Sequence, residues 1–236
     1  MAKATFGTGT SVLLNLGAAP RIVDGGMLTA LAWTHRGQPT YALEGIITAS
    51  AATLVWLRDQ LGLISDVRET EALARAVPDS GGVYLVPAFS GLGAPHWRDS
   101  ARAAIVGLSA HSDRRHLVRA ALESIGYQLR DVLGAMHANA GVPGRRLQAD
   151  GGATANGFLM QFVADITGTE LRVATAPDFS ALGAAMLGML GRGTVASLAD
   201  FDRWPRHETV FRPAMPPDVS ARAYAGWQRA VAQVLT

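Results

Sequence analysis

The order of strand-like and helix-like segments is the feature of this sequence that most constrains its fold. Residues 4–45 alternate apolar and polar side chains, with turn signals at 17–20, 24–26 and 36–38, and this pattern predicts three consecutive strands. From residue 46 onward, helical spacing alternates with short strand-like runs. This order predicts one α/β domain, in which a mixed sheet carries helices on both faces.

Five segments carry apolar side chains at helical spacing. They are residues 46–61, 112–136, 154–166, 181–190 and 219–235. Short strands are expected between them, at 83–86, 103–108, 147–149 and 171–173. Ser112 or Asp113 is predicted to cap the second helix, and Asp178 or Ser180 the fourth.

Composition restricts the classes of function. Hydrophobic residues make up 49% of the chain and charged residues 17%, which favours a folded core over disorder. Lys and Arg number 21 against 19 Asp and Glu, without a run of like charge, so a nucleic-acid interface is not expected. The absence of cysteine excludes disulfides and thiolate metal sites and is compatible with a cytoplasmic location. The longest apolar stretch, Ile46 to Leu57, is too short to span a membrane.

A glycine-rich segment near the start of the chain, Thr5–Thr10, is the first candidate for chemistry. It reads Thr-Phe-Gly-Thr-Gly-Thr and lies between or within the first strands. Glycine lets a backbone approach phosphate oxygens closely, and the threonine hydroxyls add donors. An ordinary hairpin turn has the same composition, so the segment by itself predicts either a phosphate site or a turn.

A second glycine-rich segment, residues 150–156, lies between a predicted strand and a predicted helix. Ligands bind open α/β sheets at the carboxyl ends of such strands. Because Gly151 and Gly152 lack a Cβ atom, a flat purine ring can lie against their backbone, and Asn156 is near enough to hydrogen-bond the base or ribose. The alternative is a plain strand-to-helix turn. The spacing matches neither the dinucleotide fingerprint nor the P-loop.

Two further segments have special geometry. The small residues of Ser180–Ala185 allow close packing of a helix, with a hinge as the other interpretation. The loop Pro87–Trp97 is rich in Gly and Pro, and its His96 is either a base or a structural histidine, since the neighbouring sequence offers no relay partner. No metal-ligand spacing of the HExxH, CxxC or EF-hand type occurs, so no metal site built by protein ligands is expected.

Taken in order, these segments resemble one family along nearly the whole chain, the FGGY carbohydrate kinases. Residues 103–123 also resemble the second signature of that family, with Gly107-Leu108, His116-Leu117 and the run from Ala120 to Glu123 at matching spacing. The other matching pieces are Phe6–Gly9, Tyr41–Gly45, Trp56–Asp59, Gly91–Trp97, Ala121–Ile125, Asp150–Ala153, Asn156–Phe162 and Ala181–Ala185.

The resemblance implies an actin-like, ribonuclease-H-type fold and a second, nucleotide-binding domain spanning residues 1–236. It implies that ATP arrives with Mg²⁺, which is coordinated mostly by water. The residues matching the family's nucleotide contacts are Gly7, Thr8, Gly9, Gly151, Gly152, Ala153, Asn156, Ala51 and Val55. Where the family has a glycine and a glutamine, this chain has Ala51 and Val55. Ser11 replaces an aromatic residue that lies against the substrate.

The same resemblance implies transfer of the ATP γ-phosphate to a polyol hydroxyl. Glycerol is the first expected acceptor, and Ser11 favours a longer polyol or ketose as an alternative. The aspartate that acts as general base is expected upstream of Met1, in an N-terminal domain, so this chain is expected to be inactive alone. Apolar surface near residues 1–15 and 87–97 is predicted to be exposed, which implies a homo-oligomer. A non-catalytic actin-like nucleotide-binding module is the other class of function.

Overall fold

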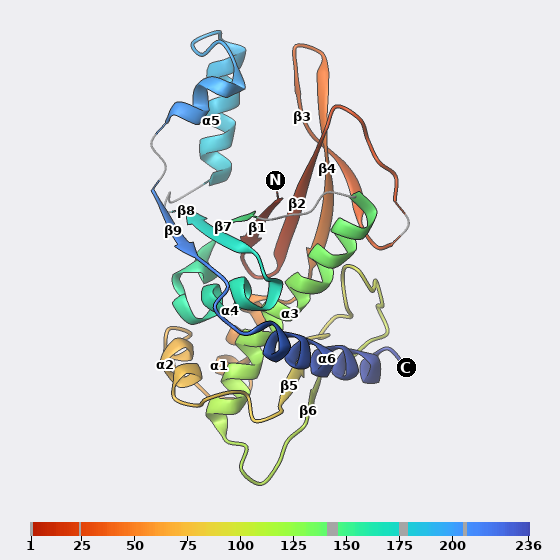
Figure 1. The fold of residues 1–236 in the computed structure, drawn as a ribbon, viewed down its shortest axis with the longest axis vertical. Helices are drawn as coiled ribbons and strands as arrows, with labels where there is room; N and C mark the ends of the chain where they lie inside the picture. Colours follow the sequence, from red (N-terminus) through yellow and green to blue (C-terminus); the bar gives the residue numbers. More distant parts are fainter. Residues whose placement is uncertain (1, 24, 141–145, 175–178, 205–206) are drawn as a thin grey trace.

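The computed structural model describes residues 2–23, 25–140, 146–174, 179–204 and 207–236. A seven-stranded sheet forms its centre (Figure 1). In spatial order the strands are β3 (Leu28–His35), β4 (Gln38–Ile47), β2 (Thr10–Gly17), β1 (Ala2–Phe6), β7 (Arg146–Asp150), β8 (Glu170–Ala174) and β9 (Glu208–Phe211). A separate antiparallel pair consists of β5 (Tyr84–Val86) and β6 (Ala104–Val106).

The middle of the sheet combines both directions of pairing. Strand β1 runs antiparallel to β2 and parallel to β7, so Ala4 pairs with Val12 on one side and Ala149 on the other. Because side chains alternate along a strand, Ala2, Ala4 and Phe6 are buried under helices, whereas Lys3 and Thr5 face the opposite side and are partly buried. The two central strands therefore present polar side chains on the less covered face.

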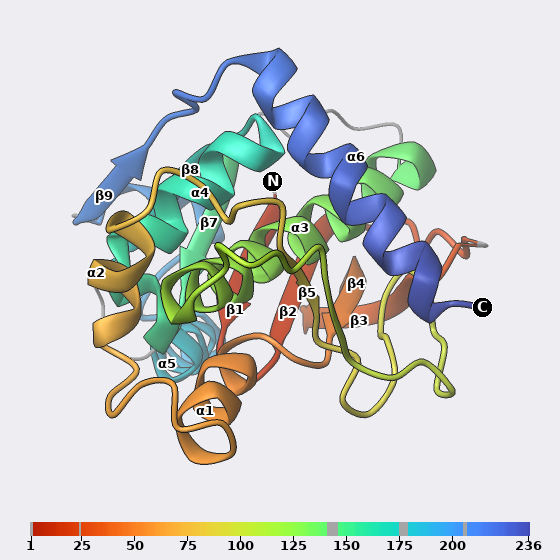
Figure 2. The same ribbon diagram turned by 90° about the horizontal axis from the view of Figure 1, so that it is seen from below.

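The described residues form six helices. Their bounds are α1 (Ala51–Asp59), α2 (Glu69–Arg75), α3 (Arg114–Ala140), α4 (Gly157–Thr167), α5 (Phe179–Gly191) and α6 (Pro217–Val234), with short 3-10 turns η1 (Gly152–Ala155) and η2 (Leu198–Arg203). The long helix α3 packs against β2, β4, α1, α2 and α4, and its Leu122, Ile125 and Leu129 are fully buried. Helix α5 stands apart beside β8 and β9, and α6 crosses below α3 (Figures 1 and 2).

A smaller second core lies under α6. Tyr127 of α3 stacks on Trp227 of α6 with ring centroids 5.4 Å apart, and Phe162 of α4 meets Tyr127 edge-on. No helix in the described part of the chain is both long and apolar enough to cross a membrane.

Sequence patterns placed several boundaries incorrectly. Residues 2–47 form four strands where three were predicted, because the chain also reverses at the turn 7–9. The helix expected from Ile46 begins at Ala51, since Ile46 and Ile47 still pair with β2. Their apolar side chains are compatible with either a strand or a helix, and they form a strand because their backbones hydrogen-bond to β2.

Other elements were missed or divided. Helix α2 and strand β9 were not predicted, and the helix expected over 154–166 is split into η1 and α4 at Asn156. Ser180 lies inside α5 and so does not cap it, while Asp178 falls outside the described residues. The long helix extends beyond Met136 to Ala140.

The exposed apolar surface expected at 1–15 and 87–97 is not found among the described residues. Phe6, Val12 and Leu14 are at most 1% exposed, because α3 covers their face of the sheet. In the second segment Leu92 and Ala94 are buried and Trp97, 43% exposed, is the one large exposed apolar side chain. The expectation was wrong because the loop folds back on the body, where Trp97 Nε1 donates to Gly26 O at 2.6 Å.

Candidate functional site

The two glycine turns lie side by side at one edge of the sheet. Strands β1 and β7 are adjacent and parallel, with Thr5 paired to Asp150, so the turns that follow them emerge together. A Cβ atom on Gly151 would lie 2.3 Å from Phe6 O, which shows how closely the second turn packs on the end of β1. The structure thus brings together residues that are more than 140 positions apart in sequence.

The first turn, Gly7–Gly9, presents free backbone donors. The carbonyls of Gly7 and Thr8 accept hydrogen bonds from the first N–H groups of α1, including Ser50 N to Thr8 O at 2.9 Å and Ala51 N to Gly7 O at 3.2 Å. Among the hydrogen bonds of the described residues, none uses the N–H groups of Thr8 or Gly9 or the Thr8 hydroxyl as donor. Anchored carbonyls and free amides make this turn suitable for an anion.

Gly9 has a steric requirement that Gly7 lacks. A Cβ atom at position 9 would meet Ile47 O at 2.4 Å, whereas one at position 7 would meet nothing closer than 3.6 Å. Glycine is therefore necessary at position 9 because β4 passes directly behind the turn.

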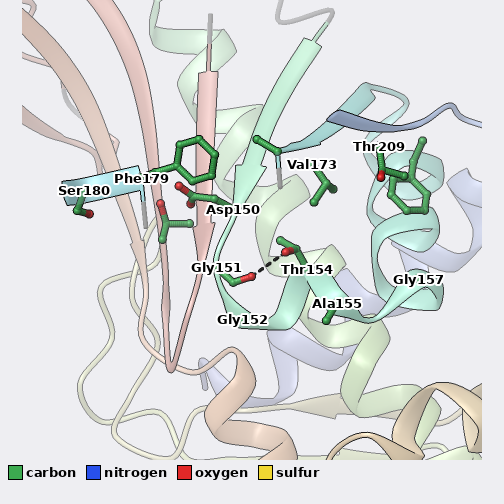
Figure 3. A pocket seen from close by; sticks show the side chains of 13 residues that line it. Asp150, Gly151, Gly152, Thr154, Ala155, Gly157, Val173, Phe179, Ser180 and Thr209 are labelled. Carbon is green, nitrogen blue, oxygen red and sulfur yellow. Dashed lines mark hydrogen bonds between the residues drawn. The ribbon is translucent and has the colours of Figure 1, made fainter. Parts of the chain in front are cut away.

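The second turn is shaped by Gly151 and leaves Gly152 open. Gly151 has φ = 99°, a conformation that favours glycine, and its carbonyl accepts from both the N–H and the hydroxyl of Thr154 (Figure 3). No atom lies within 4 Å of a Cβ placed on Gly152. Gly152 lines two cavities, so a larger side chain there would project into ligand space without straining the backbone.

A cavity of about 290 Å³ gathers five of the nine predicted nucleotide contacts. These are Ala51, Val55, Gly152, Ala153 and Asn156. Leu54 and Val67 add apolar surface, and Thr70 and Glu71 of α2 form one wall. Sequence reasoning missed α2 entirely, although Glu71 and Arg75 have the i,i+4 spacing of a helical ion pair.

Asn156 uses both ends of its amide within the protein. It caps α4, with its Oδ1 accepting from Leu159 N at 2.9 Å, and its Nδ2 donates to Thr70 Oγ1 at 3.1 Å. The Thr70 hydroxyl in turn donates to Val67 O at 2.6 Å. Asn156 thus connects α4 to α2, and a contact between it and a nucleotide stays a prediction.

Glu71 neutralises the amino end of α4. One carboxylate oxygen accepts from Gly157 N at 3.0 Å and the other pairs with Arg75 at 2.8 Å. Partial burial alone would raise the pKa of Glu71, but the hydrogen bonds from Arg75 and Gly157 outweigh burial and lower it. Because a carboxylate already occupies this helix end, an anionic group is better accommodated at the first turn.

A larger cavity of about 730 Å³ lies on the other side of η1 (Figure 3). Thr5 and Asp150 lie on its sheet side, and Val173, Phe179 and Phe211 supply apolar surface. Asp150 is 5% exposed and forms an ion pair with Lys3 at 2.8 Å. Gly151, Gly152 and Ala155 also line this cavity, so the second turn separates and borders both spaces.

Ser11, the predicted substrate contact, lies in the same transverse row of the sheet as Thr5 and Asp150. Its hydroxyl donates to Glu44 Oε1 of β4 at 2.8 Å. The pairing of Glu44 with Ser11 depends on the register between β2 and β4, so neither residue indicates the other in the sequence.

His96 has a carboxylate neighbour that the local sequence did not indicate. Its Nε2 atom lies 3.9 Å from Asp131 Oδ2 on α3. Asp131 is already engaged, accepting from the Tyr224 hydroxyl at 2.5 Å and from Trp227 Nε1 at 2.7 Å. Asp131 therefore links α3 to α6 through these two hydrogen bonds. The local sequence did not indicate this carboxylate because it lies 35 positions further along the chain, and His96 Nε2 forms no hydrogen bond among the described residues, so the pair is not a relay.

Within the described residues, no group of three or more His, Asp or Glu side chains is arranged to hold a metal ion. Ala181–Ala185 lies in the exposed part of α5, so the close packing predicted for its small residues is not seen there.

The fold and the paired turns define a class, the actin-like nucleotide-binding domain found in carbohydrate kinases. A Plasmodium falciparum glycerol kinase solved with ADP matches 100% of this chain and 47% of its own, with TM-score 0.92 and 34% identity. A gluconate kinase from Lactobacillus acidophilus matches 98% of this chain and 47% of its own, with TM-score 0.81 and 21% identity, a similarity that shows the fold alone.

The sequence comparison identifies the family within that class. The pattern of the FGGY family of carbohydrate kinases, C-terminal domain, matches residues 2–191, and the chain belongs to this family. A glycerol kinase from Shewanella oneidensis is 48% identical over 233 residues, covering 99% of this chain and 47% of that protein. The chain therefore spans about half the length of the curated relatives it matches. The family predicted from the motifs is confirmed.

Proposed function

We propose that this chain is the nucleotide-binding half of an ATP-dependent kinase that transfers the γ-phosphate to a polyol hydroxyl. The observation that carries the proposal is the meeting of the two glycine turns, at 7–9 and 151–152, beside cavities that reach both sides of the second turn. A relative 34% identical was solved with ADP, and the relatives that match nearly all of this chain over about half of their own length are named glycerol kinases. Glycerol is therefore the first candidate acceptor.

The charges at the site support one orientation of the nucleotide. The smaller cavity is walled by Ala51, Leu54 and Val55 and is suited in character to a flat base. Glu71 borders this cavity and disfavours phosphate there, whereas the amides of Thr8 and Gly9 offer donors at the first turn. The base is thus placed against α1 and α2, and the phosphates cross Gly152 toward Thr8.

The proposal assigns the remaining chemistry to a second half of the kinase. Phosphoryl transfer depends on positioning, on charge stabilisation and on an acceptor hydroxyl oriented by a base. We place the general-base aspartate and most polyol contacts in the N-terminal half, which this chain meets across a cleft. A cytoplasmic location and a homo-oligomeric state also remain predictions.

Ser11 favours a second candidate acceptor. Its hydroxyl, held by Glu44, lies at the position predicted to contact the substrate, and a small polar side chain there leaves room for additional carbon atoms and hydroxyls. A kinase for a tetritol, pentitol or ketose is the alternative. The test is to compare the phosphorylation rates of glycerol, tetritols, pentitols and ketoses by the enzyme that contains both this half and its N-terminal half. A strong preference for glycerol would reject the longer acceptors.

Calorimetric titration of the chain with ADP and ATP tests nucleotide binding directly. Gly152 lines both cavities and its Cβ position is open, so the Gly152→Leu side chain projects into the proposed site and is expected to weaken binding by at least about tenfold. Gly134→Leu is the matched control, because Gly134 is exposed on α3 and its Cβ position is also open. Equal affinity in the two variants would contradict the proposed site.

A further inference from the structure

The carbonyl groups of the first glycine turn cap helix α1. Thr8 O accepts from Ser50 N at 2.9 Å and from Ala52 N at 3.1 Å, and Gly7 O is likewise held by an amide at the start of α1. In a trans peptide, the C=O of one residue and the N–H of the next point to opposite sides of the same plane. Because these carbonyls point into α1, the N–H groups of Thr8 and Gly9 are turned away from it.

A buried pair of hydroxyl groups joins this turn to the same helix end. Thr10 Oγ1 donates to Ser50 Oγ at 2.9 Å, and the two residues are 1% and 0% exposed. Thr10 is the first residue of β2, directly after the turn, and Ser50 is the N-cap residue of α1. The hydrogen bond therefore ties the strand that leaves the turn to the helix that the turn caps.

Ser50 does not use its hydroxyl as an N-cap serine usually does. At that position the side-chain oxygen normally accepts from the N–H of the second or third helical residue, here Ala52 or Thr53. The Ser50 side chain forms no such bond, and Ala52 N donates to Thr8 O instead. By holding the Ser50 side chain toward β2, the Thr10 hydroxyl leaves the α1 amides to the carbonyls of the turn.

The segment between β4 and α1 is held from behind by the body of the domain. Gln128 of α3 is 7% exposed, and its Nε2 atom donates to Ala49 O at 3.1 Å, one residue before Ser50. The backbone of Gly9 packs against Ile47 O, where a Cβ atom would lie 2.4 Å away. Because Ser50 is anchored in this way, its bond to Thr10 fixes the position of the turn.

We infer that Thr10 and Ser50 are positioning residues for the nucleotide phosphates, an inference that rests on the proposed function. Both side chains are buried, so they act through the turn and not by touching the ligand. Gly7 and Thr8 are exposed, which places the outward N–H groups of the turn where phosphate oxygens can approach. A turn held in one geometry presents its donors without the entropic cost of ordering them on binding.

Titrations with ADP and with adenosine, followed by amide signals, separate the phosphate contribution from that of the base. Thr10→Val keeps a β-branched side chain without the hydroxyl and is expected to weaken ADP binding by about fivefold, with adenosine affinity changed by less than about twofold. Thr10→Ser keeps the hydroxyl and should retain ADP affinity. The matched control is Ser220→Ala, which removes a buried hydroxyl that accepts from Arg130 under α6 and should leave ADP affinity unchanged. Thermal unfolding of each variant verifies folding.

A second variant tests whether the two hydroxyls act as one unit. Ser50→Ala should weaken ADP binding as much as Thr10→Val, and the double variant should bind no more weakly than either, because each change removes the same hydrogen bond. Unchanged ADP affinity in Thr10→Val, an equal loss for adenosine, or failure of Thr10→Ser to retain ADP affinity would overturn the inference while leaving the proposed function intact. Absence of ADP binding to the unmodified chain would instead reject the proposed function and this inference with it.

Discussion

Removing the Asn156 side chain should destabilise the protein by breaking two hydrogen bonds that join α4 to α2. Asn156→Ala eliminates the cap on Leu159 N, worth about 1 kcal/mol, and the bond to Thr70 Oγ1, worth about 1 kcal/mol more. The expected loss is therefore about 2 kcal/mol in the free energy of unfolding, or roughly 6 °C in Tm for a chain of this size. Asn156→Asp keeps the N-cap acceptor but loses the donor to Thr70 Oγ1, so it should lose about 1 kcal/mol.

Urea denaturation measures these changes, and a double-mutant cycle isolates the bond between the helices. Thr70→Val removes the hydroxyl that accepts from Asn156, so the two variants should show a coupling of about 1 kcal/mol. The expected nucleotide affinity also falls in Asn156→Ala, because α2 forms a wall of the smaller cavity. A loss below about 0.3 kcal/mol for Asn156→Ala, or no coupling to Thr70, would refute this reasoning.

Gly9→Ala should cost roughly 3 kcal/mol in urea denaturation because its Cβ would meet Ile47 O, while Gly7→Ala should be nearly neutral, and equal costs would contradict the steric explanation. Because the pKa of Glu71 is lowered in the folded state, its contribution to the free energy of unfolding is complete above the reference value of 4.5 and is lost as pH falls through the lower folded-state value. The free energy of unfolding of Glu71→Gln should therefore depend less on pH in this acid range. An unchanged pH profile would exclude this role for Glu71. The chain alone should produce no ADP from ATP and glycerol above the rate without protein, and robust turnover would show that it contains a base of its own.

Local patterns were sufficient for some elements and insufficient for others. The two glycine turns could be recognised from sequence as glycine-rich segments, and the requirement for glycine is met at Gly9 by a close backbone approach and at Gly151 by its positive φ. The adjacency of the two turns could not be predicted from local patterns, since the parallel pairing of β1 and β7 joins segments that lie far apart in the sequence. The family resemblance supplied that information.

The details of the site depended on contacts between distant elements. Helix α2 is short and its Thr70 and Glu71 gain their roles only when they meet Asn156 and Gly157. The pairing of Lys3 with Asp150 likewise depends on strand register, because neither residue indicates its partner locally. Asn156 was singled out as a nucleotide contact, which stays a prediction. It was expected inside a helix over 154–166 because the apolar spacing continues across it, whereas it caps α4.

The most direct measurement is an ADP titration followed by amide signals of the isotopically labelled chain. Thr8, Gly9, Gly151 and Gly152 should shift together with a single dissociation constant, because one nucleotide contacts both turns. Shifts confined to one turn, or different dissociation constants for the two, would show that these glycines do not share a ligand.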